Sequence, residues 1–146
     1  MIDAKGIEQV IPHRGNMRLV DEIREYTDKT AIGIKYVRND EFWCDGHFPG
    51  KPIMPGVLII EAMAQTACFA ILRPRCANDG KTLGYFVSIE NAKFTKMVVP
   101  GDTLELRVEE VASKLKLHKF TGAAFVNDKR VASATFSAIM DDSPTD

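Results

Sequence analysis

One long apolar segment dominates the hydrophobic pattern of this chain. It reads VLIIEAMAQTACFAIL, covers residues 57–72 and is followed by Pro74. Because apolar side chains occur nearly all round, and because the segment is long and rich in Ala and Met, the pattern predicts a helix that is buried on every side. The segment is short for a membrane span, and the polar residues Glu61 and Gln65 lie inside it. We therefore expect a central core helix.

Alternating apolar and polar positions predict strands on both sides of this helix. Before it, the alternation is moderate over residues 17–26 and clearer over residues 31–38. After it, the alternating segments are 83–90, 92–99, 103–111, 115–126 and 130–140, with turns predicted at 100–102 and 127–128. One buried helix among antiparallel strands predicts a single α+β domain over residues 1–146, in which the sheet curls around the helix.

The ends and the longest polar stretch complete this outline. Asp3 is placed to cap a short helix through Val10, and Pro12 stops that helix. The polar residues 75–82 predict a loop between the central helix and the next strand. The tail, residues 141–146, is expected to be frayed.

Composition and charge are typical of a globular protein and exclude some functions. The chain has 146 residues, of which 45% are hydrophobic, and this length is enough to bury a core. With 19 basic and 20 acidic residues, it has no overall attraction for nucleic acid. Cys44, Cys68 and Cys76 are an odd number at no regular spacing, which indicates free thiols in a reducing compartment. Residues 1–14 lack the pattern of a signal peptide, so we expect a cytoplasmic protein.

Two candidates for proton transfer lie near the start of the central helix. His47 belongs to the proline- and glycine-rich loop 46–56, and a histidine acts readily as a base near neutral pH. Glu61 is a carboxyl among apolar neighbours, so it needs a specific partner or becomes a proton donor near neutral pH. A solvent-exposed helix edge or an ion pair explains Glu61 equally well, and a backbone hydrogen bond is the ordinary role of a loop histidine. The pairing of both near one helix start favours catalysis.

The first turn of the helix adds a candidate for binding a carbonyl oxygen. Pro52 and Pro55 have no N–H, so the amides of Gly56 and Val57 are the expected free donors at the positive end of the helix dipole. Without a Cβ, Gly56 would let a substrate carbonyl approach closely, and its amide would stabilise a developing enolate. By itself, a Pro–Gly step before a helix is also a common helix start.

The other polar candidates are less specific. Gln65 lies one turn after the helix carboxyl, where it either holds the carboxyl or the neighbouring loop, or is a buried amide bonded to backbone. Cys44 and His47 have the spacing of metal ligands, but no second pair follows, and His13 and His118 lie in unrelated settings. We therefore predict no metal site.

The loop and helix together form a recognisable motif. GHFPGKPIMPGVLIIEAMAQ (46–65) resembles the signature of (3R)-hydroxyacyl-[acyl-carrier-protein] dehydratases, the hot-dog-fold enzymes of type II fatty acid synthesis. Weaker matches occur at 11–14, 19–23, 93–102 and in the closing hairpin, so the resemblance covers nearly the whole chain. It implies a hot-dog fold and the dehydration of 3-hydroxyacyl thioesters to trans-2-enoyl thioesters, without a cofactor.

The resemblance also implies roles for single residues. His47 matches the catalytic histidine of the family, Glu61 the catalytic glutamate, and Gly56 the amide that polarises the thioester. We expect a homodimer in which His47 of one protomer faces Glu61 of its partner, with dimers often assembling into hexamers. His47 is the expected base and Glu61 the expected acid, acting directly or through a water. A substrate tunnel is expected to be lined by Tyr85 as its gate and by Phe48, Pro55 and Gln65.

The expected partner is an acidic acyl carrier protein. Candidate basic contacts at the tunnel mouth are Lys93, Lys96, Arg73 and Arg75, which are otherwise ordinary surface residues. In one place the chain departs from the family, which usually has an aromatic residue and a proline after PHR, where this chain has Gly15 and Asn16. This loop is less bulky, so the range of acyl chain lengths and the pathway served stay open.

Two other functions fit the same fold. A hot-dog acyl thioesterase would hydrolyse the thioester and would not need both a histidine and a buried glutamate. A non-catalytic acyl-binding hot-dog domain would have no need to retain a costly buried carboxyl. The presence of both His47 and Glu61 favours the dehydratase.

Overall fold

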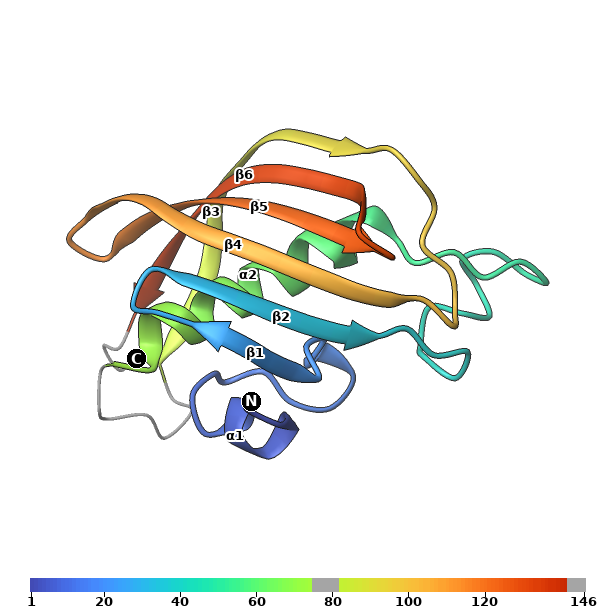
Figure 1. Ribbon diagram of the computed structural model, residues 1–146, viewed down its shortest axis with the longest axis horizontal. Helices are drawn as coiled ribbons and strands as arrows, with labels where there is room; N and C mark the ends of the chain where they lie inside the picture. The colour runs from blue at the N-terminus through green and yellow to red at the C-terminus, as the bar shows by residue number, and fades with distance from the viewer. Residues whose placement is uncertain (75–81, 142–146) are drawn as a thin grey trace.

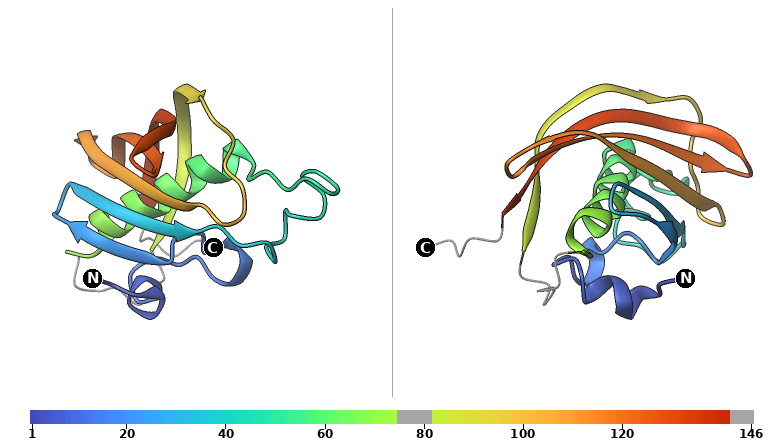
Figure 2. Two further views of the ribbon diagram at one scale, coloured as in Figure 1. Left: turned by 45° about the vertical axis from the view of Figure 1, so that its right-hand side comes forward. Right: turned by 60° about the vertical axis from the view of Figure 1, so that its left-hand side comes forward.

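The architecture is a curved antiparallel sheet wrapped around one long helix. The computed structural model describes residues 1–74 and 82–141. Its elements are α1 (Ala4–Glu8), η1 (Gly15–Met17), β1 (Glu22–Tyr26), β2 (Thr30–Tyr36), α2 (Gly56–Leu72), β3 (Leu83–Phe94), β4 (Thr103–Lys114), β5 (Leu117–Val126) and β6 (Lys129–Asp141). The six strands lie in the order β1-β2-β4-β5-β6-β3, and α2 crosses the concave face of the sheet (Figures 1 and 2). This is the α+β hot-dog arrangement that the sequence predicted.

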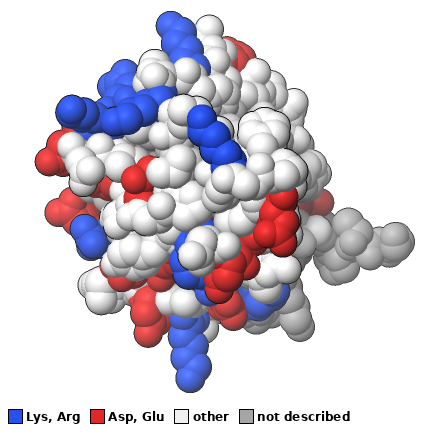
Figure 3. Space-filling view, turned by 90° about the vertical axis from the view of Figure 1, so that its right-hand side faces the viewer, with Lys and Arg blue, Asp and Glu red and all other residues white. Residues whose placement is uncertain are grey.

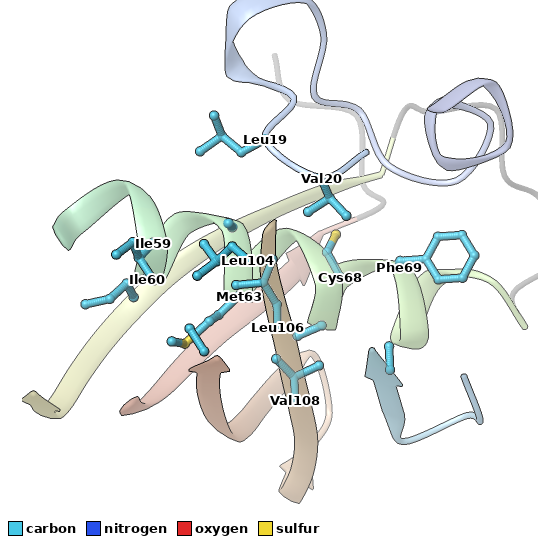
Figure 4. Packing of buried hydrophobic residues seen from close by; sticks show 14 of the residues in the cluster. Leu19, Val20, Ile59, Ile60, Met63, Cys68, Phe69, Leu104, Leu106 and Val108 are labelled. Carbon is cyan, nitrogen blue, oxygen red and sulfur yellow. The ribbon is translucent and has the colours of Figure 1, made fainter. Parts of the chain in front are cut away.

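The core lies between α2 and the inner face of the sheet. The helix is buried from Ile59 to Leu72, apart from Glu61 and Ala64, which are partly exposed. Figure 4 shows Met63 of the helix close to the inward-facing apolar side chains of β4, which are Leu104, Leu106 and Val108. Burying a side chain of this kind stabilises the fold by about 1.5–3 kcal/mol. The predicted core helix is thus confirmed, and its one partly exposed stripe carries the carboxyl.

Two local predictions from turn and cap chemistry are confirmed. The Asp3 side chain accepts a hydrogen bond from the Gly6 N–H at 3.0 Å and caps α1, which ends at Glu8. Asn127 and Asp128 turn the β5–β6 hairpin with φ angles of 51° and 65°. Both angles lie in the left-handed region, as a two-residue type I′ hairpin requires.

The expectation of a strand beginning at residue 17 is wrong. Residues 15–17 form the short η1 helix, and β1 begins only at Glu22. The side chain of Gln65 bonds to the backbone of Met17 and Leu19. Because a core side chain takes these backbone groups, this part of the chain packs on α2 instead of extending the sheet.

The expectation of separate strands at 83–90 and 92–99 is also wrong. β3 is one strand from residue 83 to residue 94, and its pairing with β6 shifts register between Glu90 and Lys93. Asn91 at this irregularity has a φ of 53°. A bulge changes which side chains face the core, so in the sequence it looks like the end of one strand and the start of another.

Part of the sequence predictions falls outside the described residues. The loop at 75–82, the tail at 141–146, and the side chains of Arg75 and Cys76 lie there wholly or almost wholly. Among the helices in the described ranges, none has both the length and the apolar character needed to cross a membrane.

Candidate active site

His47 is held by the backbone of its own loop. Its N–H donates to the Trp43 carbonyl at 2.9 Å, and its carbonyl accepts from the Ile53 N–H at 2.7 Å. The ring nitrogen Nδ1 lies 2.7 Å from the Ile53 carbonyl oxygen. Since a carbonyl only accepts, Nδ1 carries the hydrogen, and in the neutral form of the ring Nε2 is the unprotonated nitrogen. The backbone bond therefore prepares the imidazole to act as a base through Nε2.

A buried ion pair ties this loop to the sheet. Lys35 Nζ on β2 lies 2.8 Å from Glu41 Oε1, and the two side chains are only 3% and 6% exposed. The same carboxylate accepts from the Arg38 N–H at 2.8 Å and from Trp43 Nε1 at 3.3 Å. The carbonyl of Trp43 in turn accepts a hydrogen bond from the His47 N–H. The ion pair therefore holds the turn that positions the imidazole.

The His47 side chain lines an apolar pocket of about 690 Å³ together with Gly56, Val57 and Phe94. The phenyl ring of Phe48 stacks on the imidazole, with ring centroids 4.2 Å apart, and is half exposed. Pro55 is the N-cap residue of α2, and its carbonyl accepts from the third and fourth amides of the first turn. Among the described residues, the amides of Gly56 and Val57 have no hydrogen-bond partner, which leaves them available to a ligand in the pocket.

The space beside Gly56 is filled by an aromatic ring. A Cβ at this position would lie 2.8 Å from the Phe94 ring, closer than real Cβ contacts occur. Packing against Phe94 thus requires glycine at this position. This reason adds to the one that the sequence suggested, the close approach of a substrate carbonyl. The Phe94 ring and the first turn of α2 form one wall of the pocket.

Glu61 lies in a second, smaller pocket of about 230 Å³, which it lines with His13, Cys68 and Tyr85. Its side chain is 21% exposed. Burial raises the pKa of Glu61 above the ordinary value of 4.5, although the hydrogen bond from Gln65 acts in the opposite direction. Burial thus favours the neutral carboxyl, the form that can donate a proton.

Gln65 lies behind this carboxyl and connects it to the N-terminal loop. Its Oε1 accepts from the Leu19 N–H at 2.8 Å, while its Nε2 donates to the Met17 carbonyl at 2.7 Å and to Glu61 Oε2 at 2.9 Å. The residue is 1% exposed. It therefore holds both the carboxyl and the loop, and its place is behind the site instead of along the wall of a tunnel.

His13 belongs to the site, and the prediction that it lies in an unrelated setting is wrong. Its Nε2 is 3.5 Å from Glu61 Oε2, and its side chain is 16% exposed. The sequence signal was the weak family match at residues 11–14, which includes this histidine. His118, in contrast, is buried on the inner face of β5, where its Nδ1 bonds to Glu110.

One chain does not bring the two proton-transfer groups together. His47 lines the larger pocket at the start of α2, and Glu61 lines the smaller pocket farther along the helix. Both pockets border β3 or the segment that follows it, because Tyr85 lines one and Phe94 lines the other. Each pocket of the single chain thus holds one half of the predicted catalytic pair.

Comparison with known proteins finds relatives that match nearly the whole chain. The chain is 48% identical over 141 residues to the 3-hydroxyacyl-[acyl-carrier-protein] dehydratase FabZ of Gluconobacter oxydans (strain 621H), covering 95% of this chain and 83% of that protein. It is 47% identical over 143 residues to the protein of the same name from Acetivibrio thermocellus, covering 97% of both.

A solved structure with the same fold is the dehydratase heterocomplex ApeI:P from Xenorhabdus doucetiae. One of its chains matches with a TM-score of 0.77 and 16% identity, covering 93% of this chain and 91% of that chain. At this identity the likeness shows the hot-dog fold alone. A family model described as a FabA-like domain matches residues 11–135. With most of its length covered by that model and by relatives above 40% identity, the chain belongs to the FabA-like family.

Proposed function

We propose that two copies of this chain build each active site together, with His47 of one copy and Glu61 of the other as the proton-transfer pair. The chain is a 3-hydroxyacyl-[acyl-carrier-protein] dehydratase, a lyase of fatty acid synthesis. The observation that carries the proposed arrangement is the separation of the two groups into two pockets that both border β3.

The chemistry assigns one step to each group. The Nε2 of His47 takes the proton from C2 of the substrate, and the electron pair moves toward the thioester carbonyl, whose oxygen is stabilised by the Gly56 amide. As the C2–C3 double bond forms, the C3–O bond breaks and the leaving hydroxyl takes the proton of Glu61, directly or through a water. Water and a trans-2-enoyl thioester are the products. A proton must then pass from His47 back to Glu61 before the next turnover.

The free edge of β3 is the expected contact between the two copies. β3 pairs with β6 along one edge, and no described strand pairs with its other edge. Every second side chain over the first part of this strand is large, apolar or aromatic, and 42–54% exposed: Leu83, Tyr85, Val87 and Ile89. A long apolar strand at a sheet edge is a template for pairing with another chain. Pairing of β3 with its copy would bring together the pockets that border this strand; assembly of such dimers into hexamers stays a prediction.

The acyl carrier protein is expected to dock near the larger pocket. In the face shown in Figure 3, several Lys and Arg side chains lie together at the upper left, and others lie among acidic side chains lower down. Lys93 and Lys96 are exposed on either side of Phe94, and Lys96 lines the pocket that contains His47. Arg73 lies at the opposite end of α2, where it pairs with Asp28. Lys93 instead lines another pocket, so Lys96 supports the carrier-protein contact best.

The state of Glu61 favours dehydration over thioester hydrolysis. Hydrolysis needs a water and one base, and it would leave without a part in the reaction a carboxyl whose pKa is raised by burial. Incubation with a 3-hydroxybutyryl thioester separates the two reactions. Enoyl product is expected, and release of free thiol without enoyl product would contradict the dehydratase.

Mixing two inactive variants tests whether the site is shared. His47→Gln and Glu61→Gln are each expected to lower kcat by at least about 100-fold. If each site takes one group from either copy, random re-association of equal amounts makes half of the dimers mixed, and each mixed dimer has one intact site. Activity should then return to about a quarter of the wild-type value. No recovery, with mixed dimers demonstrated by a tag on one variant, would overturn the shared site.

A further inference from the structure

The carboxyl of Glu61 has unequal surroundings at its two oxygens. Oε2 lies 2.9 Å from Gln65 Nε2 and 3.5 Å from His13 Nε2. For Oε1, no hydrogen bond is found among the described residues. The two oxygens are therefore expected to have different tasks in proton transfer.

The orientation of Gln65 is fixed by its other contacts. Its amide oxygen accepts from the Leu19 N–H, and its amide nitrogen donates to the Met17 carbonyl. Reversing the amide would place a donor against a donor and an acceptor against an acceptor, so the nitrogen must face the carboxyl. Glu61 Oε2 consequently accepts one N–H from α2 itself.

The tautomer of His13 follows from its burial. Nδ1 of this ring is buried and has no hydrogen-bond partner. A hydrogen on Nε2 lies near the Glu61 oxygen, whereas a hydrogen on Nδ1 would be buried without an acceptor, which costs about 1–3 kcal/mol, so the tautomer with its hydrogen on Nε2 is favoured. Burial and the neighbouring Arg14 both lower the pKa of His13, which agrees with a neutral ring. The hydrogen is then on Nε2, the nitrogen that faces Glu61 Oε2.

We propose that His13 is a positioning residue that, together with Gln65, occupies Oε2 of Glu61 and thereby leaves the catalytic proton on Oε1. Gln65 Nε2 donates to Oε2 at 2.9 Å, and His13 Nε2 lies 3.5 Å from the same oxygen, so a proton on Oε2 would lie close to both N–H groups. Besides His13, the polar side chains that line the pocket of this carboxyl are Cys68 of α2 and Tyr85 of β3. This assignment rests on the proposed role of Glu61 as the acid, and it adds which oxygen delivers the proton and which residue decides this.

Two substitutions of His13 separate hydrogen-bond donation from simple filling of space. In His13→Gln, an amide nitrogen can take the place of Nε2–H, whereas His13→Leu fills similar space without a donor. We expect His13→Leu to lower kcat by about 10- to 100-fold with KM changed by less than about twofold, and His13→Gln to keep kcat within about threefold of wild type.

The outcomes distinguish this inference from the proposed function. If wild type dehydrates and Glu61→Gln is inactive while His13→Leu keeps full kcat, the positioning role fails and the dehydratase stands. Equal loss of kcat in His13→Gln and His13→Leu would also overturn it. If wild type forms no enoyl product, the proposed function itself fails.

A spectroscopic measurement keeps the inference testable even if His13→Leu does not fold. Imidazole ¹⁵N shifts of the labelled wild-type protein report which ring nitrogen carries the hydrogen, and loss of signals in His13→Gln identifies this ring. At about pH 7 we expect a neutral His13 with its hydrogen on Nε2. A hydrogen on Nδ1, or a charged ring, would overturn the assignment.

Discussion

The two halves of the candidate site are built in opposite ways. His47 stands on an irregular loop, where backbone carbonyls and a buried ion pair fix its position, and its ring faces a wide pocket. Glu61 stands on the most buried helix of the fold, beside a pocket of about one third the volume, where burial raises its pKa. Hydrogen bonding sets the tautomer of the proposed base, and burial raises the pKa of the proposed acid.

This difference is the reason for the proposal that two copies share each site. A loop that exposes a base and a helix that buries an acid have different surroundings, and in one chain they line separate pockets. Joining two sheets at β3 would let each environment keep its character while the two groups meet across the interface. Substitutions in the interface, in the loop and in the helix should therefore differ in their effects on association, activity and stability.

The largest effect is expected from a charge on the free edge of β3. Ile89 is 46% exposed in the single chain, and Ile89→Lys would place like charges close together in a paired edge. We expect a monomer by light scattering and a loss of dehydration of at least about 100-fold, because the halves no longer meet. Leu115→Lys, at a site that is 92% exposed, is the matched control and should change neither property. If Ile89→Lys remains an active dimer, the proposal that β3 forms the interface is wrong.

An intermediate effect is expected from the ion pair that holds the loop of His47. Lys35→Met leaves the carboxylate of Glu41 buried without its partner, which should lower the free energy of unfolding by about 3–5 kcal/mol and reduce kcat in the folded fraction. Denaturant unfolding and steady-state kinetics measure the two effects.

The same loop offers a control and a rescue. Asp40→Ala breaks an exposed pair with Arg38, which water and salt screen, so it should leave the free energy of unfolding nearly unchanged. Adding Glu41→Leu to Lys35→Met removes the unpaired charge, so much of the stability should return without the activity. Full activity in the double variant would mean that the ion pair does not position His47.

The smallest effect concerns stability against pH at Glu61. Its pKa is raised in the folded state, so wild type has its full stability below the unfolded pKa near 4.5 and loses part of it as the pH rises through the folded pKa. Glu61→Gln has no such loss. In scanning calorimetry, the Tm of the variant minus that of wild type should therefore become more positive from about pH 4 to about pH 8. Glu109→Gln, which removes an exposed charge, is the control, and a difference for Glu61→Gln that shrinks with pH would contradict burial of the carboxyl.

The sequence alone was sufficient to predict the features that depend on a local hydrophobic pattern or on local turn chemistry. The apolar run at 57–72 predicted α2, Asp3 predicted a helix cap, and residues 127–128 predicted a hairpin turn. The motif at 46–65 placed His47 and Glu61 among the candidates. These features depend on residues that are close together in the chain, so they can be read directly from the sequence.

The tertiary structure decided everything that depends on residues far apart in the chain. A bulge near Asn91 joined two apparent strands, and Gln65 drew the backbone of residues 17–19 away from the sheet. The contact of His13 with Glu61 spans 48 positions of sequence, so no periodicity or spacing could reveal it. Local patterns fix elements through backbone geometry, whereas the tautomer, the burial and the partner of a catalytic group are set by whatever the fold packs against it.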